Sequence, residues 1–292
     1  MNGFPLTSTE PPVTFRVADT AGVHFLQWCL PKLRLRWRGF RRVRRQVYRR
    51  LEKRMAALGL AELADYQLRL EREPTEWAVL DTICRIPLTR FYRDRAVFEH
   101  LERVVLPELG RMAMARGDTE MRGWSLGCAS GEEPHTVAIV WRIGVAPRFP
   151  RLTLRIVATD CDREAIERAR RGCYPAHSLR DLPQTMRAEA FRESSAGLVI
   201  EDRYRVGVDF HVQDVRTRMP DGPFHLILCR NVVFTYFDEE LQRQILPRIA
   251  RRLVAGGALV IGASESLPER PEGLEPWPGG HTVYRRLPEA TD

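Results

Sequence analysis

Residues 122–141, RGWSLGCASGEEPHTVAIVW, decide the fold of this chain. A short apolar run ends in two glycines four residues apart, Gly127 and Gly131, and two glutamates, a proline and a further apolar pattern follow. Glutamates suit the positive end of a helix dipole, and proline suits a first turn because its missing N–H is not needed there. The stretch predicts a strand, a glycine loop and a helix start. The same spacing also occurs in ordinary turns, and the absence of a full G-x-G-x-x-G disfavours NAD.

A second β-branched run, LTLRIVAT at 152–159, ends in an acid and is followed by another helical pattern. A strand, loop, helix, strand and acid in this order are typical of the first half of a doubly wound nucleotide fold. Asp160 is therefore expected to accept hydrogen bonds from ribose hydroxyls. Its alternative role is to cap the next helix, which Asp162 could do equally well.

The remaining pattern predicts an α/β fold with two domains. Residues 1–35 are expected to form a poorly ordered or divergent extension, 36–116 a helical domain, and 121–288 a doubly wound domain with a mostly parallel sheet. The boundary is placed at the polar, turn-like segment 116–120. Expected helices are 40–58, 63–72, 74–84, 96–115, 163–171 and 239–253, with a glycine pair ending the last, and expected later strands are 208–212, 224–229, 258–263 and 282–285.

Composition indicates a globular cytoplasmic protein. The chain has 292 residues, of which 44% are hydrophobic and 29% charged, which is ordinary for a globular protein with a core. No run of about 18 apolar residues and no signal peptide are recognised, so neither a membrane span nor secretion is expected. The six cysteines show no C-x-x-C spacing, which disfavours a zinc site or a disulfide framework and favours reduced thiols.

Positive charge is concentrated in one segment. Between Pro31 and Leu60 there are 12 Lys and Arg against the single acid Glu52, whereas the rest of the chain holds 34 basic and 37 acidic groups. The arginines surround an apolar helical stripe that ends at Gly59. They form either a solvated helix surface or a docking surface for an acidic partner, such as an acidic protein helix, nucleic acid or an anionic membrane face.

Four motifs occur in a recognisable order. They are PLTRFYRD at 87–94, WSLGCASGEEP at 124–134, ATDCD at 158–162, and CRNV at 229–232 followed by YFD. Together they resemble the CheR family of S-adenosylmethionine-dependent methyltransferases, which esterify glutamate side chains of chemotaxis receptors. The resemblance covers roughly residues 41–286. It implies a class I, Rossmann-like domain with a small antiparallel β subdomain at about 174–209, whose ability to bind a receptor-tail peptide is left open.

The resemblance also implies which residues form the site. A carboxylate acceptor is already ionised at neutral pH, so the enzyme has to align it and supply a counter-charge rather than a base. Arg93 and Arg230 are implied to face the acceptor carboxylate in a common cleft, with Tyr236 near the methyl group. The residues implied to contact S-adenosylmethionine are Thr89, Arg93, Gly127, Glu133, Asp160, Asp214, Val215, Arg230 and Asn231. The basic helix 41–54 is implied to dock an acidic protein, such as a receptor helical bundle.

Other interpretations of these residues stay open. Thr89 would equally cap a turn, Asp214 would serve a strand end, Tyr236 would pack on its neighbour, and the two arginines would form a surface salt bridge. The chain also departs from the family pattern at Pro87, Tyr92 and His135 and has one extra residue before Tyr236, which puts the acceptor in doubt. The alternatives are a cofactor-binding scaffold docked through the basic helix, and a methyltransferase for a small molecule or, less favoured, a nucleic acid.

Overall fold

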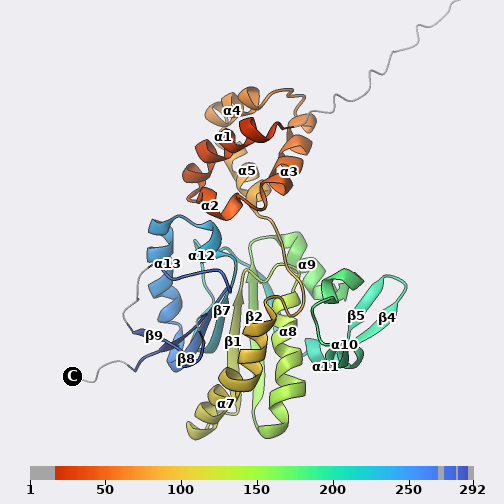
Figure 1. The fold of residues 1–292 in the computed structure, drawn as a ribbon, viewed down its shortest axis with the longest axis vertical. Coiled ribbons are helices and arrows are strands. Elements are labelled where there is room, and N and C mark those ends of the chain that lie inside the picture. Colours follow the sequence, from red (N-terminus) through yellow and green to blue (C-terminus); the bar gives the residue numbers. More distant parts are fainter. Residues whose placement is uncertain (1–16, 269–272, 281, 289–292) are drawn as a thin grey trace, which may run out of the picture. The chain divides into compact units, whose positions relative to one another are not determined.

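The structure of the chain is a computed structural model that describes residues 17–268, 273–280 and 282–288. It has two compact units, which divide between Ile86 and Pro87 (Figure 1). Each unit is described on its own. In the described residues no helix is both long enough and apolar enough to span a bilayer.

The first unit is helical. Aromatic contacts bring its helices together: the ring centroids of the buried Phe25 and Tyr66 lie 6.0 Å apart, and those of the partly buried Trp28 and Trp77 lie 5.6 Å apart. The Tyr66 hydroxyl donates to the buried Glu76 carboxylate at 2.8 Å, and Arg54 pairs with the same carboxylate. The helices are α1 (Asp19–Cys29), η1 (Leu30–Leu33), α2 (Trp37–Phe40), α3 (Arg44–Ala57), α4 (Leu63–Arg72) and α5 (Glu76–Cys84).

The second unit contains a seven-stranded sheet of order β6-β2-β1-β7-β8-β10-β9. The five strands from β6 to β8 are parallel, whereas β10 pairs antiparallel with both β8 and β9. Figure 1 shows α13 flanking the sheet on the side opposite α7 and α8. The strands are β1 (Glu120–Leu126), β2 (Thr153–Asp160), β6 (Val208–Val212), β7 (Phe224–Cys229), β8 (Leu253–Ile261), β9 (Leu274–Pro276) and β10 (Val283–Arg286).

A three-stranded antiparallel sheet of order β3-β5-β4 forms the predicted small subdomain. Its elements are β3 (Cys173–Tyr174), η5 (Ala176–Leu179), α10 (Gln184–Ala190), β4 (Phe191–Ser194), β5 (Gly197–Ile200) and α11 (Asp202–Arg205). The remaining helices of the second unit are α6 (Arg95–His100), η2 (Leu101–Val105), α7 (Leu106–Ala115), α8 (Glu132–Val140), η3 (Trp141–Val145), η4 (Ala146–Arg148), α9 (Arg163–Arg171), α12 (Val233–Tyr236) and α13 (Glu239–Ala250).

The fold class agrees with the sequence analysis, but the unit boundary does not. The segment 116–120 ends a helix, and the units divide 30 residues earlier, after Ile86. The reason is that α6 to α7 pack on the sheet: Phe98, Leu101 and Leu109 share one buried cluster with Leu226 of β7. The N-terminal boundary also differs, because α1 belongs to the helical unit although its residues fall within 1–35, which were expected to be poorly ordered or divergent. Residues 1–16 of that extension lie outside the described residues.

Two predicted helix boundaries are also wrong. The expected helix 40–58 is broken, because α2 ends at Phe40 and α3 begins at Arg44. The expected helix 239–253 ends at Ala250, and Leu253 already pairs with Phe224 as the first residue of β8. The glycine pair expected to end that helix lies inside β8, where Gly256 has φ +77° beside an irregularity in the register. Such a bulge is a usual place for glycine within a strand.

Candidate functional site

The candidate site lies where three parallel strands end together. Leu126 at the end of β1 pairs with Thr159 of β2 and with Cys229 of β7. The glycine loop after β1, Asp160 and the Arg230–Asn231 segment therefore begin at the same edge of the sheet. In open α/β sheets, ligands bind at this carboxyl edge.

The side chain of Asp160 fixes the backbone of the glycine loop. Its Oδ2 accepts a hydrogen bond from Ala129 N at 2.8 Å, and its Oδ1 accepts one from Asp162 N at 2.9 Å. Helix α9 is capped by Asp162, whose Oδ1 accepts from Ala165 N, so Asp160 is not the helix cap. Ala129 has φ +47°, a conformation that costs free energy for a residue with a Cβ and that this hydrogen bond helps to hold.

Gly127 is required by the packing of the protein itself. Its φ is +72°, and a Cβ placed on it would lie 2.3 Å from the Cγ2 atom of Val232. The loop after β1 and the loop after β7 are therefore in direct contact, and a larger residue at 127 would separate them.

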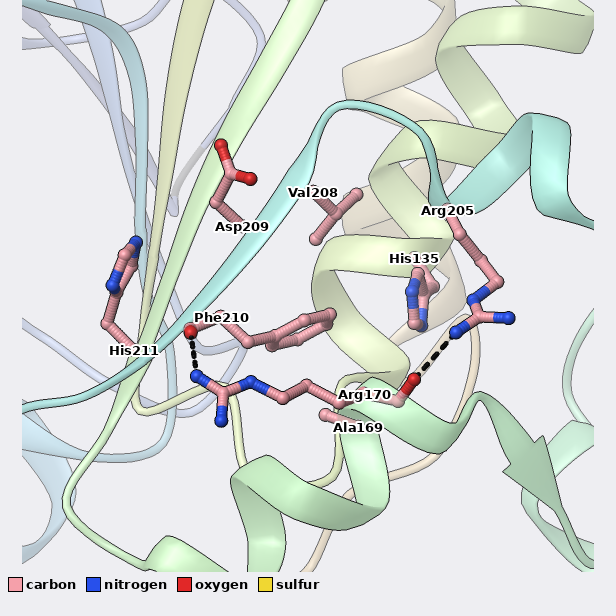
Figure 2. A pocket seen from close by; sticks show the side chains of 8 residues that line it. All are labelled: His135, Ala169, Arg170, Arg205, Val208, Asp209, Phe210 and His211. Carbon is pink, nitrogen blue, oxygen red and sulfur yellow. Dashed lines mark hydrogen bonds between the residues drawn. The ribbon is translucent and has the colours of Figure 1, made fainter.

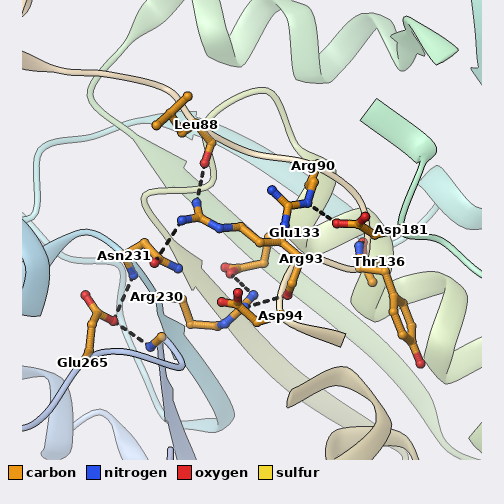
Figure 3. Close-up of polar contacts among 12 residues, drawn as sticks. Leu88, Arg90, Arg93, Asp94, Glu133, Thr136, Asp181, Arg230, Asn231 and Glu265 are labelled. Carbon is orange, nitrogen blue, oxygen red and sulfur yellow. Dashed lines mark hydrogen bonds and ion pairs between the residues drawn. The ribbon is translucent and has the colours of Figure 1, made fainter. Parts of the chain in front are cut away.

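Arg230 is a buried cation that joins three segments of this edge (Figure 3). Its side chain is 2% exposed, and it pairs with Glu133 of α8 at 3.0 Å and with Asp94 at 2.9 Å. It also donates to the Arg93 carbonyl at 2.8 Å and lies over the Phe98 ring at 4.9 Å. The alternative of a surface salt bridge is therefore wrong for Arg230. A buried pair of this kind needs further hydrogen bonds to offset desolvation, and Ser125 Oγ supplies one to Glu133 Oε1 at 2.7 Å.

Arg93 lies at the outer side of this cluster. One terminal nitrogen donates to the Leu88 carbonyl, and the other donates to Asn231 Oδ1 at 3.1 Å. Its neighbours Tyr92 and Asp94 have φ +58° and +62°, which are unusual values for residues other than glycine. The Tyr92 ring is stacked on Phe98, and Asp94 is held by Arg230, so the surroundings maintain this strained turn.

Glu265 belongs to the same cluster, and the sequence analysis missed it. Its Oε2 accepts from the backbone N–H groups of Asn231 at 2.9 Å and Gly262 at 2.6 Å, and its Oε1 accepts from Thr235 Oγ1 at 2.5 Å. The available signal was its position shortly after β8, which is parallel to β7 and ends at the same edge. Gly262 is needed there, because a Cβ on it would lie 2.8 Å from Glu265 Oε2.

The remaining predicted site residues are Tyr236, Asp214, Val215 and Thr89. Tyr236 is the last residue of α12. Burial raises the pKa of its hydroxyl; the positive charge of Arg93 lowers this pKa, and the negative charge of Glu265 raises it further. The Asp214 carboxylate is bound by the Arg216 guanidinium, with Nη2 and Oδ2 2.7 Å apart. The hydrogen bond from Gln213 N to Asp160 O brings the buried Val215 and Asp214 to the end of β2. Thr89 is partly buried and precedes Arg93 by four residues in the sequence.

Burial changes the acidity of the two glutamates of α8. Desolvation raises the pKa of Glu133, whereas the Arg230 charge and the Ser125 hydrogen bond oppose this change. Glu132 is 3% exposed, and burial raises the pKa of its carboxyl to about 7. Its Oε1 lies 3.3 Å from Ser130 Oγ, and its Oε2 has no hydrogen-bond partner among the described residues.

The comparisons with known proteins match both units. Residues 87–282 match the model "CheR methyltransferase, SAM binding domain", and residues 43–80 match "CheR methyltransferase, all-alpha domain". A probable chemotaxis protein methyltransferase of Rhizobium etli is 33% identical over 75% of this chain and 83% of its own length. The chemotaxis protein methyltransferase of Escherichia coli is 33% identical over 82% of both chains. That of Listeria monocytogenes is 34% identical over 64% of this chain and 68% of its own.

Replacing Arg230 with Met should destabilise the second unit by about 3–5 kcal/mol, because the substitution leaves the buried Glu133 and the partly buried Asp94 without their cation. Urea unfolding followed by tryptophan fluorescence measures this change. The control is Arg155→Met, which removes the solvent-exposed pair with Asp209 and should have little effect. Equal effects of the two substitutions would contradict the importance assigned to the buried pair.

Replacing Glu132 with Gln should stabilise the protein at alkaline pH. The pKa of Glu132 is raised in the folded state to about 7, so folding costs free energy once the carboxyl is ionised, and this cost disappears below its unfolded pKa. Relative to the wild type, the free energy of unfolding of the variant should rise by roughly 3 kcal/mol between pH 5 and pH 8.5. The control is the exposed Glu164→Gln. A difference that does not change with pH would contradict this assignment.

Proposed function

The chain belongs to the CheR methyltransferase family and uses S-adenosylmethionine, and we propose that its acceptors are glutamate carboxylates of an acidic signalling protein of the chemoreceptor type. The product is then a protein methyl ester. The observation that carries this proposal is Arg93, a partly buried cation at the outer side of the Arg230 cluster. An acceptor that is itself an anion needs such a counter-charge when it enters a site of low polarity.

The residues at the carboxyl edge fit S-adenosylmethionine, which supplies an electrophilic methyl group when bound. The glycine loop offers a backbone surface without large side chains, and Asp160 stands where ribose hydroxyls would be bound. Glu133 provides carboxylate oxygens for an ammonium group, while Arg93 and Asn231 provide donors for a carboxylate. We assign Thr89, Gly127, Asp214, Val215 and Arg230 to the wall of this cofactor site.

The proposed role of the site is to align the methyl group with the acceptor carboxylate and not to transfer a proton. A glutamate acceptor is ionised at neutral pH, so its oxygen can attack the methyl group without a general base. Arg93 orients the acceptor, and Tyr236, whose raised pKa keeps its hydroxyl protonated, donates a hydrogen bond beside it. Arg230 is engaged by Glu133 and Asp94, and we therefore propose that it positions the Arg93 turn rather than binding the acceptor itself.

The first unit is proposed to dock the acceptor protein through a basic face of α3. Several arginines of this region already have partners inside the unit: Arg44 pairs with Asp19, and Arg54 pairs with Glu76. The exposed cations Arg45, Arg49 and Lys53 follow one another at intervals of four residues and therefore share one face of the helix. Such a face complements an acidic helical surface. We propose that the reaction takes place in the cytoplasm.

Methyl transfer into extracts of the source cells tests the proposed acceptor. With labelled S-adenosylmethionine, a protein band should become labelled, and mild alkali should release the label as methanol. Arg93→Ala should lower kcat/KM by about 10- to 100-fold, because the charge-assisted interactions of Arg93 with the acceptor and with the cofactor carboxylate are lost. Arg95→Ala is the matched control, since Arg95 is exposed and pairs with Glu99. Label that survives alkali would refute carboxylate esterification and favour an amine or nucleic-acid acceptor.

Reversing the charge of the α3 face should weaken docking. The variant Arg45→Glu/Arg49→Glu/Lys53→Glu should raise KM for the labelled acceptor protein by about tenfold or more while kcat changes little. The variant Arg111→Glu/Arg151→Glu/Arg171→Glu alters exposed arginines of the second unit and gives the same change in net charge. If both variants raise KM equally, net charge rather than the α3 face governs the encounter.

A further inference from the structure

A cavity lies beside the edge strand β6. It has a volume of about 350 Å³, which is within the usual range for small-molecule sites, and it is lined by residues of α8, α9, α11 and β6 (Figure 2). None of its lining residues was singled out for the cofactor or acceptor site. Phe210 and Val208 give it apolar wall, and Arg170 and Arg205 give it positive charge.

His135 is one of the lining residues of this cavity, and its ring carries a buried nitrogen, Nε2, without a hydrogen-bond partner among the described residues. The His135 side chain is fully buried. The other ring nitrogen, Nδ1, lies 2.9 Å from the Tyr174 hydroxyl, and that hydroxyl lies 2.9 Å from the Ser130 carbonyl. A buried polar atom without a partner is costly, which makes this nitrogen a candidate contact for a ligand.

The protonation of His135 follows from its neighbours. Residue 134 is a proline, so the Ser130 carbonyl cannot accept a hydrogen bond from a backbone N–H at 134, and the Tyr174 hydroxyl donates to it instead. The hydroxyl has a single proton, and His135 Nδ1 must therefore be the donor in their contact. Burial and the nearby Arg205 charge lower the pKa of His135 to about 3, so the ring is neutral and Nε2 carries a lone pair.

Both arginines of the cavity have carboxylate partners that are exposed to solvent. Arg205 contacts Asp202 at 3.2 Å and Arg170 contacts Glu167 at 2.8 Å, and both pairs are exposed to solvent. Exposed pairs of this kind contribute little. Asp209 is the acid among the described lining residues, and Arg155 pairs with it at 2.9 Å. Counted over the lining residues alone, two arginines against one carboxylate leave a single positive charge, which suits a monoanion.

We propose that this cavity binds a small carboxylic acid that also carries a hydroxyl or amino group. The carboxylate lies on the guanidinium of Arg205 and is supported by Arg170. The O–H or N–H group donates to His135 Nε2, and the apolar part of the molecule packs against Phe210 and Val208. The three features are needed together, because the arginines alone would accept any anion.

Matched probes test the two polar requirements separately. The acids are mandelate, 3-hydroxybenzoate and 4-hydroxybenzoate; the methyl ether of each lacks the donor, and the methyl ester of each lacks the charge. Binding to the full chain is followed by saturation-transfer NMR and by the ¹⁵N signal of the His135 Nε2 atom. At least one acid should bind about tenfold more tightly than its own ether and ester, and should shift the Nε2 signal.

Variants locate the binding. Arg205→Gln should lower the affinity for the acid about tenfold, whereas Arg171→Gln, on an exposed arginine of α9 outside the cavity, should leave it unchanged. The proposal is overturned if no acid binds at millimolar concentration, if an ether binds as well as its acid, or if inorganic phosphate binds more tightly than every acid. Equal losses in both variants would show a general effect of charge and would overturn it as well.

Discussion

The geometry of the proposed methyl-transfer site depends on the ion pairs of one buried arginine. Arg230 follows the last residue of β7, and its guanidinium holds Glu133 at the start of α8 and Asp94 at the start of α6. These three segments are far apart in the sequence, and the ion pairs of the Arg230 side chain connect them. A cation that is 2% exposed is tolerated because two carboxylates and a carbonyl accept hydrogen bonds from it. Removal of one partner therefore disturbs all three segments at once.

Around this arginine the chain accepts unfavourable local conformations. Tyr92, Asp94, Ala129 and Asn231 all have positive φ without being glycine. Each is held by a contact described above: a stacked ring, an ion pair, the Asp160 carboxylate or the Glu265 carboxylate. Backbone strain of this kind persists only where the surroundings fix it, and its concentration at one edge of the sheet agrees with a preorganised site.

The local sequence pattern predicted those parts of the site that depend on neighbouring residues in the sequence. The glycine loop, the acid at the end of β2 and the strand before Arg230 follow from β-branched runs and turn residues. Glu265 was missed because its partners, such as Asn231, are brought to it by the parallel pairing of β7 and β8. The unit boundary was misplaced for a similar reason: the turn at 116–120 marks the end of a helix, while the buried face of α6 and α7 packs on strands that come later. An apolar residue recurs every four positions from Leu241 to Leu253, and this repeat led to the prediction of a helix that extends beyond Ala250, where α13 ends.

The contact between Gly127 and Val232 has a consequence for reading related sequences. A glycine after the first strand of such a sheet is commonly taken as a sign that a ligand approaches the backbone. Here the nearest obstacle to a side chain is Val232 of the neighbouring loop, at 2.3 Å from the position of a Cβ. Selection for folding alone would therefore retain this glycine, and a descendant that had lost its cofactor would still carry it.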